Sequence, residues 1–180
     1  MLLKTLESSE APTLITKALW VLTNILHDEK DFMIQIVSDF EGGALFSKAM
    51  ELLVHSNDCE VHRNALLSLT GFILTGVEKA PELVHRIERE NPLVLEGLLK
   101  RGLKSLSSNY DSLRNSLFSI ELLIDLDQGD KELKIDDQRR FVPRFIAANG
   151  HNYLKEAQRH SEMEIYNLVS QISDAIDDYE

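Results

Sequence analysis

Two residues suited to ligand binding stand one helical turn apart near the start of the chain. Trp20 is the only tryptophan, and Asn24 follows four positions later within the largely apolar run 16–26. An indole face attracts cations, and a carboxamide both donates and accepts hydrogen bonds. The alternative is a packed tryptophan with a satisfied polar neighbour. The pair therefore indicates either a site for an extended cationic ligand or a core position.

Other reactive side chains are too scattered to indicate a metal site or an enzyme. Cys59 and His62 lie three apart at a predicted helix start, but a zinc site needs two further ligands. No nucleophile flanked by glycines and no phosphate-binding loop occurs. We expect no enzyme activity, no metal and no cofactor. The remaining histidines are not clustered; they are His27, His55, His85, His151 and His160.

Composition predicts a folded, acidic protein. The 180 residues are 43% hydrophobic, and the formal net charge is −11. Such a chain can bury a good core, and it repels the phosphates of nucleic acid. Net acidity favours basic partners, although it can also serve solubility alone.

The chain shows no signal peptide and no apolar run long enough to span a membrane. Cys59 is the only cysteine, so a disulfide within the chain is impossible, which fits a reducing compartment. We therefore expect a protein of the cytoplasm and nucleus that has no membrane partner.

The run around Trp20 recurs along the chain. Similar segments begin at Arg63, Arg114 and Tyr166, which aligns Trp20 with Leu67, Phe118 and Ser170 at spacings of 47, 51 and 52 residues. Repeats of two or three helices have periods near 40–47 residues, and longer loops would account for the excess. The sequence predicts an array of helical repeats.

Each period reads as three helices, with no strand-like alternation. We expect one domain over 1–180 with units at about 1–29 (incomplete), 30–77, 78–129 and 137–180, and a charged linker at 127–140. Ser9, Pro12 and Asp58 are start signals, Gly76 and Gly129 are end signals, and Asn91–Pro92 is a break. The expected helices lie at about 2–8, 12–26, 32–37, 44–54, 60–74, 81–90, 93–106, 111–126, 141–148, 153–159 and 162–178.

The three-helix period resembles the armadillo repeat. The run from Ala18 to Asn24 is similar to the Trp-x-x-x-Asn helix of the importin alpha family, the adaptors that read nuclear localisation signals. Segments 153–160 and 164–168 resemble the last repeat of that family. The resemblance implies an all-α, right-handed superhelical solenoid of three-helix repeats.

The resemblance also implies a peptide site. In that family the tryptophans form slots for the aliphatic stems of lysines, and the asparagines bind the peptide backbone, so Trp20 and Asn24 are the matching pair. The other repeats depart from the motif and carry Leu67 and Gly71, Phe118 and Leu122, and Ser170 and Asp174. The family's basic N-terminal segment is absent from this sequence.

Further candidates come from the alignment of the recurring segments on Trp20. One turn earlier stand Thr16, Arg63, Arg114 and Tyr166, and a further turn earlier stand Thr13, Glu60, Asp111 and Met163. If these helices line a concave face, Glu60 and Asp111 could meet a basic peptide. Arg63 and Arg114 would oppose the peptide or pair with neighbouring acids. The alternative for all four charges is a solvated helix face. The complete set of candidate peptide-binding residues is Trp20, Asn24, Thr16, Glu60, Arg63, Asp111, Arg114 and Phe118.

Two functions remain open on these grounds. The first is an import adaptor that binds basic signal peptides, with nuclear transport factors as possible partners at the last repeat. The second is an armadillo scaffold that binds a folded protein. We also expect self-association at the N-terminal edge, where Leu2, Leu3 and Leu6 would lack a preceding repeat to cover them.

Overall fold

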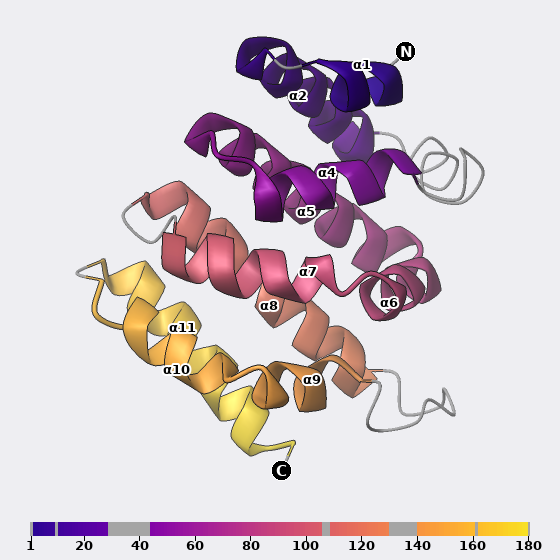
Figure 1. Ribbon diagram of the computed structural model, residues 1–180. Helices are drawn as coiled ribbons and strands as arrows, with labels where there is room; N and C mark the ends of the chain where they lie inside the picture. Colours follow the sequence, from indigo (N-terminus) through magenta and orange to yellow (C-terminus); the bar gives the residue numbers. More distant parts are fainter. Residues whose placement is uncertain are drawn as a thin grey trace. The chain divides into compact units, whose positions relative to one another are not determined.

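A computed structural model describes residues 2–9, 11–28, 44–105, 109–129, 140–160 and 162–179. Throughout these ranges the regular structure is helical, which confirms the all-α prediction (Figure 1). The helix expected at about 32–37 and most of the charged linker at 127–140 lie outside the described residues.

The helix bounds largely match the predicted ones. The first part of the chain contains α1 (Leu2–Ser8), α2 (Pro12–Asp28), α4 (Ala44–His55), α5 (Cys59–Lys79) and α6 (Pro81–Glu90). The second part contains α7 (Leu93–Glu96), the π-helix η2 (Gly97–Ser105), α8 (Tyr110–Gly129), α9 (Phe141–Ala147), α10 (Gly150–Ala157) and α11 (Met163–Asp177).

The chain divides into two compact units, residues 1–87 and 88–180, with the boundary inside α6. In the first unit α1 packs on α2 and α4, and α5 packs on α2 and α4. In the second unit η2 packs on α8 and α10, and α11 packs on α8 and α10. Each unit thus contains two stacked helix pairs. In the first unit α2 lies on α5 and α1 on α4, and in the second α8 lies on α11 and η2 on α10, which is the packing expected of repeats.

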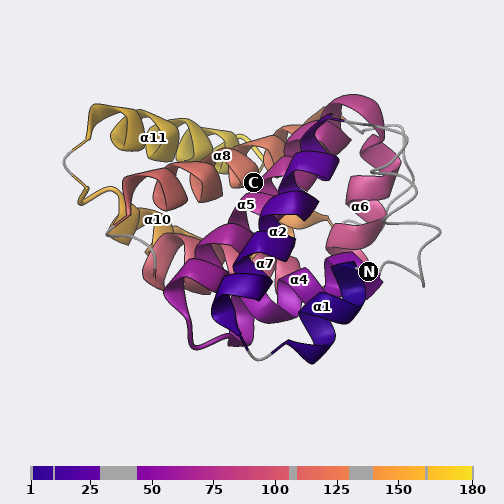
Figure 2. The ribbon, with the colours of Figure 1, turned by 90° about the horizontal axis from the view of Figure 1, so that it is seen from above.

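We call α2, α5, α8 and α11 the repeat helices, since they carry the recurring segments. In the first unit Leu19 contacts Ser68, and Thr23 lies near both Ser68 and Gly71, so the contacts advance together along α2 and α5. These two helices therefore run parallel, side by side in both views (Figures 1 and 2). In the second unit, contacts of α8 with α11 advance together in the same way, from Arg114–Glu164 to Gln128–Ala175.

Local signals explain where most helices begin. Pro12 is the first residue of α2, where its missing N–H costs nothing. Asp58 caps α5 and accepts hydrogen bonds from the backbone N–H groups of Glu60 and Val61. The side chain of Asn91 accepts the N–H of Leu93 at the break between α6 and α7. Each of these boundaries confirms a predicted start or break.

Helix α10 begins at Gly150, three residues before the predicted start, and two further differences have a clear physical reason or consequence. Helix α5 continues through Gly76 to Lys79, because burial of the preceding turn outweighs the weak helix propensity of glycine. The helix expected over 93–106 begins as α7 and widens into η2 at Gly97. Gly102 in η2 lies so close to α8 that an added Cβ would be 1.9 Å from the Oγ of Ser116.

The N-terminal edge also differs from the prediction. Leu6 is buried, and Leu2 and Leu3 are half-buried, because α1 packs on both α2 and α4. The expectation that all three leucines are uncovered is therefore wrong. The exposed large apolar side chains of α2 are Leu14, Trp20 and Val21, at 53%, 60% and 38% exposure.

Candidate functional site

The repeat helices bury the same pattern of positions. In α2 the buried residues Ile15, Leu19, Leu22 and Leu26 follow the spacing i, i+4, i+7 and i+11. The equivalent sets are also buried, and they are His62, Leu66, Leu69 and Ile73 in α5, Leu113, Leu117, Ile120 and Ile124 in α8, and Ile165, Val169, Ile172 and Ile176 in α11. The offsets of 47, 51 and 52 residues predicted from sequence thus align structurally equivalent positions.

This pattern places Trp20 and Asn24 outside the core. Trp20 is 60% exposed, and Asn24 is exposed one turn further along α2. The interpretation of Trp20 as a core residue is therefore wrong. Thr16, one turn before Trp20, is half-buried. The three side chains form a short ladder along α2, with an aromatic face and a carboxamide available to a ligand.

The interface with α5 fixes the position of α2. The hydroxyls of Thr23 and Ser68 lie 2.8 Å apart, and Ser68 donates a hydrogen bond of 3.2 Å to the carbonyl of Leu19. Gly71 lies at this interface, where an added Cβ would make an ordinary van der Waals contact, 3.7 Å from the carbonyl oxygen of Thr23. Gly71 stands in the position of Asn24 but is buried, so this position in α5 serves packing.

The charged candidates of the first unit lie together on α5. Glu60 and Arg63 form an ion pair of 3.6 Å between side chains that are 57% and 44% exposed. An exposed pair of this kind contributes little to stability. Either side chain can therefore turn to a charged ligand at small cost. Leu67, in the position of Trp20, is half-buried and offers no comparable aromatic face.

The second unit uses its candidate arginine in a contact between two repeat helices. The Nε of Arg114 lies 2.6 Å from the Oε1 of Glu164, and the hydroxyl of Tyr110 donates a hydrogen bond to the Oε2 of the same carboxylate. These bonds, first from Tyr110 and then from Arg114, lower the pKa of Glu164. Arg114 thus pairs with a neighbouring acid, which was one of the two predicted possibilities. Asp111 is exposed, and Phe118 is half-buried.

Sequence reasoning did not single out Glu164 or Tyr110 as partners of Arg114. Glu164 follows Arg114 by 50 residues, close to the repeat period. An acid and a base separated by one period stand on adjacent parallel helices, and this is the signal that could have identified the pair.

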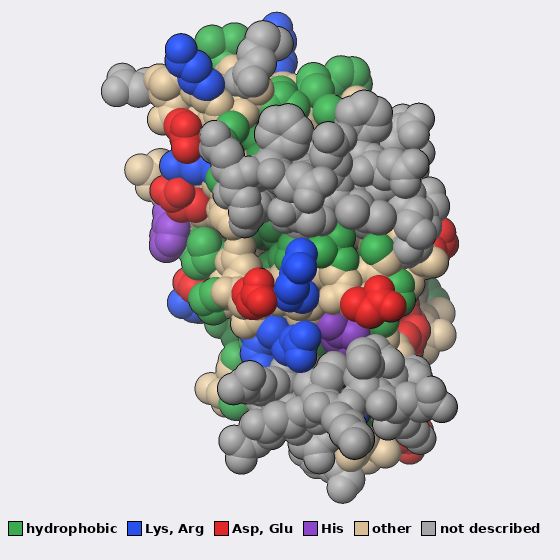
Figure 3. All heavy atoms as spheres, turned by 90° about the vertical axis from the view of Figure 1, so that its right-hand side faces the viewer, with side chains coloured by type: hydrophobic (Ala, Val, Ile, Leu, Met, Phe, Trp, Pro, Cys, Tyr) green, Lys and Arg blue, Asp and Glu red, His purple; other side chains and the backbone are tan. Residues whose placement is uncertain are grey.

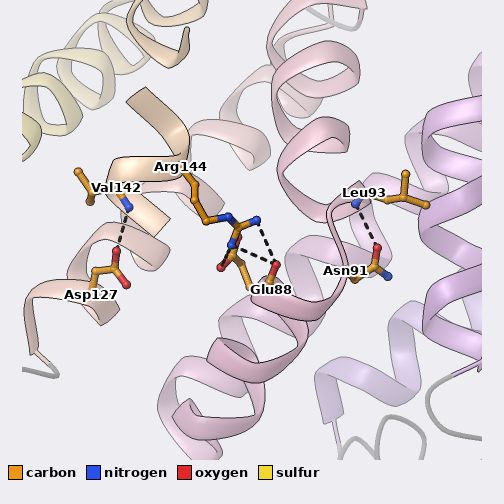
Figure 4. A network of polar contacts seen from close by, with 6 residues as sticks. All are labelled: Glu88, Asn91, Leu93, Asp127, Val142 and Arg144. Atoms are coloured by element: carbon orange, nitrogen blue, oxygen red, sulfur yellow. Dashed lines mark hydrogen bonds and ion pairs between the residues drawn. The ribbon is translucent and has the colours of Figure 1, made fainter. Parts of the chain in front are cut away.

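A buried ion pair in the second unit was also not predicted. Both carboxylate oxygens of Glu88, a residue only 3% exposed, accept hydrogen bonds of 2.7 Å from Arg144 of α9 (Figure 4). Burial raises the pKa of Glu88 to about 7, although Arg144 opposes the shift. The neighbouring Asp127 accepts the N–H of Val142 at the start of α9. These contacts join α9 to α6 through Glu88 and to α8 through Asp127.

Cys59 and His62, at the start of α5, lie in different environments and do not form a common metal site. Cys59 is exposed, whereas His62 is buried and its Nε2 contacts the backbone oxygen of Ser56. In the described part of the chain no three His, Cys, Asp or Glu side chains are grouped to hold a metal ion.

The distribution of charged side chains and the character of the helices in the described residues concern two further kinds of partner, nucleic acid and membranes. On the face drawn in Figure 3, acidic and basic side chains lie side by side instead of separating by sign. Within the described residues, no helix has the length and apolar character needed to cross a membrane.

Comparisons with known proteins bear on the fold alone. No protein-family model matches the sequence, and no curated protein matches it. A solved crystal structure described as an engineered protein aligns over 98% of this chain and 80% of its own length. The TM-score is 0.51 and the sequence identity is 16%, so the similarity is one of fold.

Proposed function

We propose that this chain is a peptide-binding module of the armadillo type, similar to the nuclear import adaptors, that binds basic extended segments at Trp20 and Asn24. The observation that carries the proposal is the 60% exposure of Trp20 with Asn24 exposed one turn away. Exposing a tryptophan forgoes a large gain from burial, so a binding role accounts for its position.

The repeat geometry supports the armadillo part of the proposal. The repeat helices bury equivalent sets at spacings of 47, 51 and 52 residues, and they run parallel within each unit. In an armadillo-type right-handed solenoid such helices line one face, and Thr16, Trp20 and Asn24 belong to that face on α2. A segment lying across the face would meet their side chains in succession.

Charge defines the class of ligand. The net charge of −11 attracts a Lys- or Arg-rich segment. A cation over the indole of Trp20 would contribute about 0.5–2 kcal/mol, and a hydrogen bond to Asn24 about 0.5–1.5 kcal/mol. Glu60, exposed in the same unit as Trp20, adds an electrostatic attraction that salt screens. With one Trp/Asn pair, binding is weak once the cost of association is subtracted.

The same resemblance sets the cellular context of the proposal. An adaptor for nuclear localisation signals works in both the cytoplasm and the nucleus. Its last repeat would be available to nuclear transport factors. These assignments rest on the resemblance of segments 153–160 and 164–168 to the last repeat of importin alpha.

The alternative function is a scaffold that binds a folded protein, and one observation favours it. Met163 and Tyr166 on α11 are 71% and 49% exposed, although both are large and apolar. Methionine and tyrosine are enriched at protein interfaces. A scaffold would use this surface of the second unit and would not need Trp20.

A titration separates the two functions. A fluorescein-labelled Lys/Arg-rich peptide is titrated with the protein at low salt, and anisotropy is recorded. Trp20→Ala and Asn24→Ala should each weaken binding, whereas Met163→Ala and Tyr166→Ala should not. Affinity should fall as salt is added. An acidic peptide of equal length is the control. Absence of binding by the wild type at low salt would remove the adaptor function.

A further inference from the structure

One side of α2 is exposed although the equivalent side of α5 is buried. Leu14 and Val21 are 53% and 38% exposed, and Lys17 between them is exposed as well. The equivalent residues on α5, 47 positions later, are Val61, Asn64 and Ser68, which are 1%, 9% and 0% exposed. The same face of two equivalent helices is thus covered in one case and open in the other.

The helix that covers this face of α5 is α2 itself. Ser68 donates to the carbonyl of Leu19 and lies 2.8 Å from the hydroxyl of Thr23. Leu19 and Thr23 therefore mark the side of α2 that packs on the following repeat helix. At 3.6 residues per turn, Leu14, Lys17 and Val21 lie on the side of α2 opposite to Leu19 and Thr23, so this open face points away from α5.

We infer that the Leu14–Lys17–Val21 face of α2 docks an amphipathic α-helix of a partner protein, parallel to α2, with an acidic residue opposite Lys17. Continuity with the α2–α5 interface gives the orientation, since one repeat helix packs on the next in parallel. The apolar pair Leu14 and Val21 gives the affinity. Lys17 gives the charge preference.

Lys17 also argues against a second copy of this chain as the occupant. It stands midway between Leu14 and Val21, three residues from one and four from the other. If two copies packed α2 against α2 about a two-fold axis, each Lys17 would face its equivalent. Like charges in that position repel, whereas an acidic residue would pair with the ammonium group.

The chain supplies a suitable probe. Leu66 and Thr70 of α5 are equivalent to Leu19 and Thr23 of α2, at an offset of 47 residues. Since Leu19 and Thr23 pack on the next repeat helix, a peptide of α5 presents the equivalent side chains for packing on α2. By the same offset Arg63 of the peptide corresponds to Thr16 of α2. If the peptide docks on α2 in the way that α2 packs on α5, its residue 63 lies near Lys17. We choose a peptide of residues 59–79 carrying Cys59→Ser and Arg63→Glu. It is held helical by a lactam bridge on its far side, formed between the side chains of Asn64→Lys and Ser68→Glu.

The experiment is an anisotropy titration of this labelled peptide with the full chain. We expect saturable binding that Leu14→Glu and Val21→Glu each weaken by about tenfold or more, since each places a charge in an apolar contact. The peptide that retains Arg63 should bind about two- to fivefold more weakly, and Lys17→Glu should reverse this preference. Melting curves should show that all three protein variants stay folded.

The inference is independent of the proposed peptide site, and the variants distinguish the two. Trp20→Ala should weaken binding of the basic peptide and leave binding of the helical peptide unchanged. Helical-peptide binding that is absent, or that Leu14→Glu does not change, overturns the inference. Self-association of the protein alone, detected by sedimentation and abolished by Leu14→Glu, would show that the face binds a second copy and would overturn the choice of a partner helix.

Discussion

Trp20 and its neighbour Leu19 show how one helical position decides the role of a residue. Leu19 is fully buried, at 0% exposure, whereas Trp20 is 60% exposed. A side chain contributes to the free energy of folding in proportion to the apolar area that it removes from water. The largest side chain of α2 therefore contributes less to stability than the smaller one beside it, which leaves Trp20 available for binding.

This contrast gives a first prediction. Trp20→Ala should change the free energy of unfolding by less than about 1 kcal/mol, because little buried area is lost. Leu19→Ala, the matched control, should cost about 2–5 kcal/mol. Denaturant unfolding followed by circular dichroism measures both. Comparable losses in the two variants would mean that Trp20 is packed after all.

Arg63 allows a second prediction at the residue scale. It pairs with Glu60 at 3.6 Å, and both side chains are exposed. Removing the guanidinium leaves Glu60 without this partner and takes a positive charge away from the ligand face. Arg63→Ala should therefore strengthen binding of a Lys-rich peptide about two- to fivefold, with little change in stability. The titration of the basic peptide measures it, with Lys48→Ala, which removes the positive charge of the Lys48–Glu51 pair, as the control for net charge. Weaker binding by Arg63→Ala would contradict the assignment of this face.

Glu88 gives a prediction about pH. Its pKa of about 7 in the folded protein exceeds the value of 4.5 expected in the unfolded chain, chiefly because the carboxyl group is buried. Between these values the folded state binds more protons than the unfolded state, so this group makes stability fall as pH rises from about 4.5 to 7. The effect is on the order of 3 kcal/mol.

Glu88→Gln removes this titration and keeps a hydrogen-bond acceptor for Arg144. Its free energy of unfolding, relative to that of the wild type, should therefore rise between pH 5 and pH 8. Chemical denaturation at several pH values measures the difference. If the difference between the two proteins did not change with pH, the carboxylate of Glu88 would be charged throughout the range.

At the scale of elements, substitution of two helix glycines by alanine should have opposite effects on stability. A Cβ added at Gly102 of η2 would lie 1.9 Å from the Oγ of Ser116, whereas one added at Gly71 of α5 would lie 3.7 Å from the nearest atom. Gly102→Ala should cost about 1–3 kcal/mol of stability, and adding Ser116→Ala should restore part of it. Gly71→Ala should be neutral or slightly stabilising, because alanine favours the helix. Thermal melts measure these effects in the wild type, in Gly102→Ala, in the double variant with Ser116→Ala, and in Gly71→Ala. Equal effects at the two glycines would contradict the close approach of η2 to α8.

The elements themselves were largely predictable, because helical periodicity and capping residues are local. Asp58, Asn91 and Pro12 act where their chemistry indicates, and the offsets of 47, 51 and 52 residues align buried positions. The end of α5 was missed because burial overrides the propensity of Gly76. The pair Glu88–Arg144 was missed because its 56-residue separation is not a repeat offset and neither residue belongs to a repeat helix.

The candidate site was predictable only in part. Sequence placed Trp20 and Asn24 on one face of a helix, but it left the choice between core and surface open. The packing of α2 on α5 decides that choice, since Leu19 and Thr23 face α5 and Trp20 does not. The partner of Arg114 depends likewise on which helices are neighbours. Local patterns specify the faces of a helix, and tertiary packing specifies which face remains open.

At the scale of the whole molecule, net charge and a single tryptophan combine to favour one direct test. The chain carries a formal charge of −11, and its only tryptophan lies at the proposed site. Electrostatic attraction brings a basic segment to the acidic molecule, and the exposed indole reports whether the segment reaches α2. No label is needed.

The decisive measurement is the quenching of Trp20 fluorescence by acrylamide, with and without a Lys-rich peptide at low salt. A 60% exposed indole should be quenched efficiently in the free protein. We predict that saturating peptide shields the ring and lowers the quenching constant, that Asn24→Ala shifts the midpoint to higher peptide concentration, and that salt reverses the protection. Quenching that is unchanged while the labelled peptide is bound would place the peptide elsewhere and contradict the assignment of Trp20 and Asn24 as the binding site.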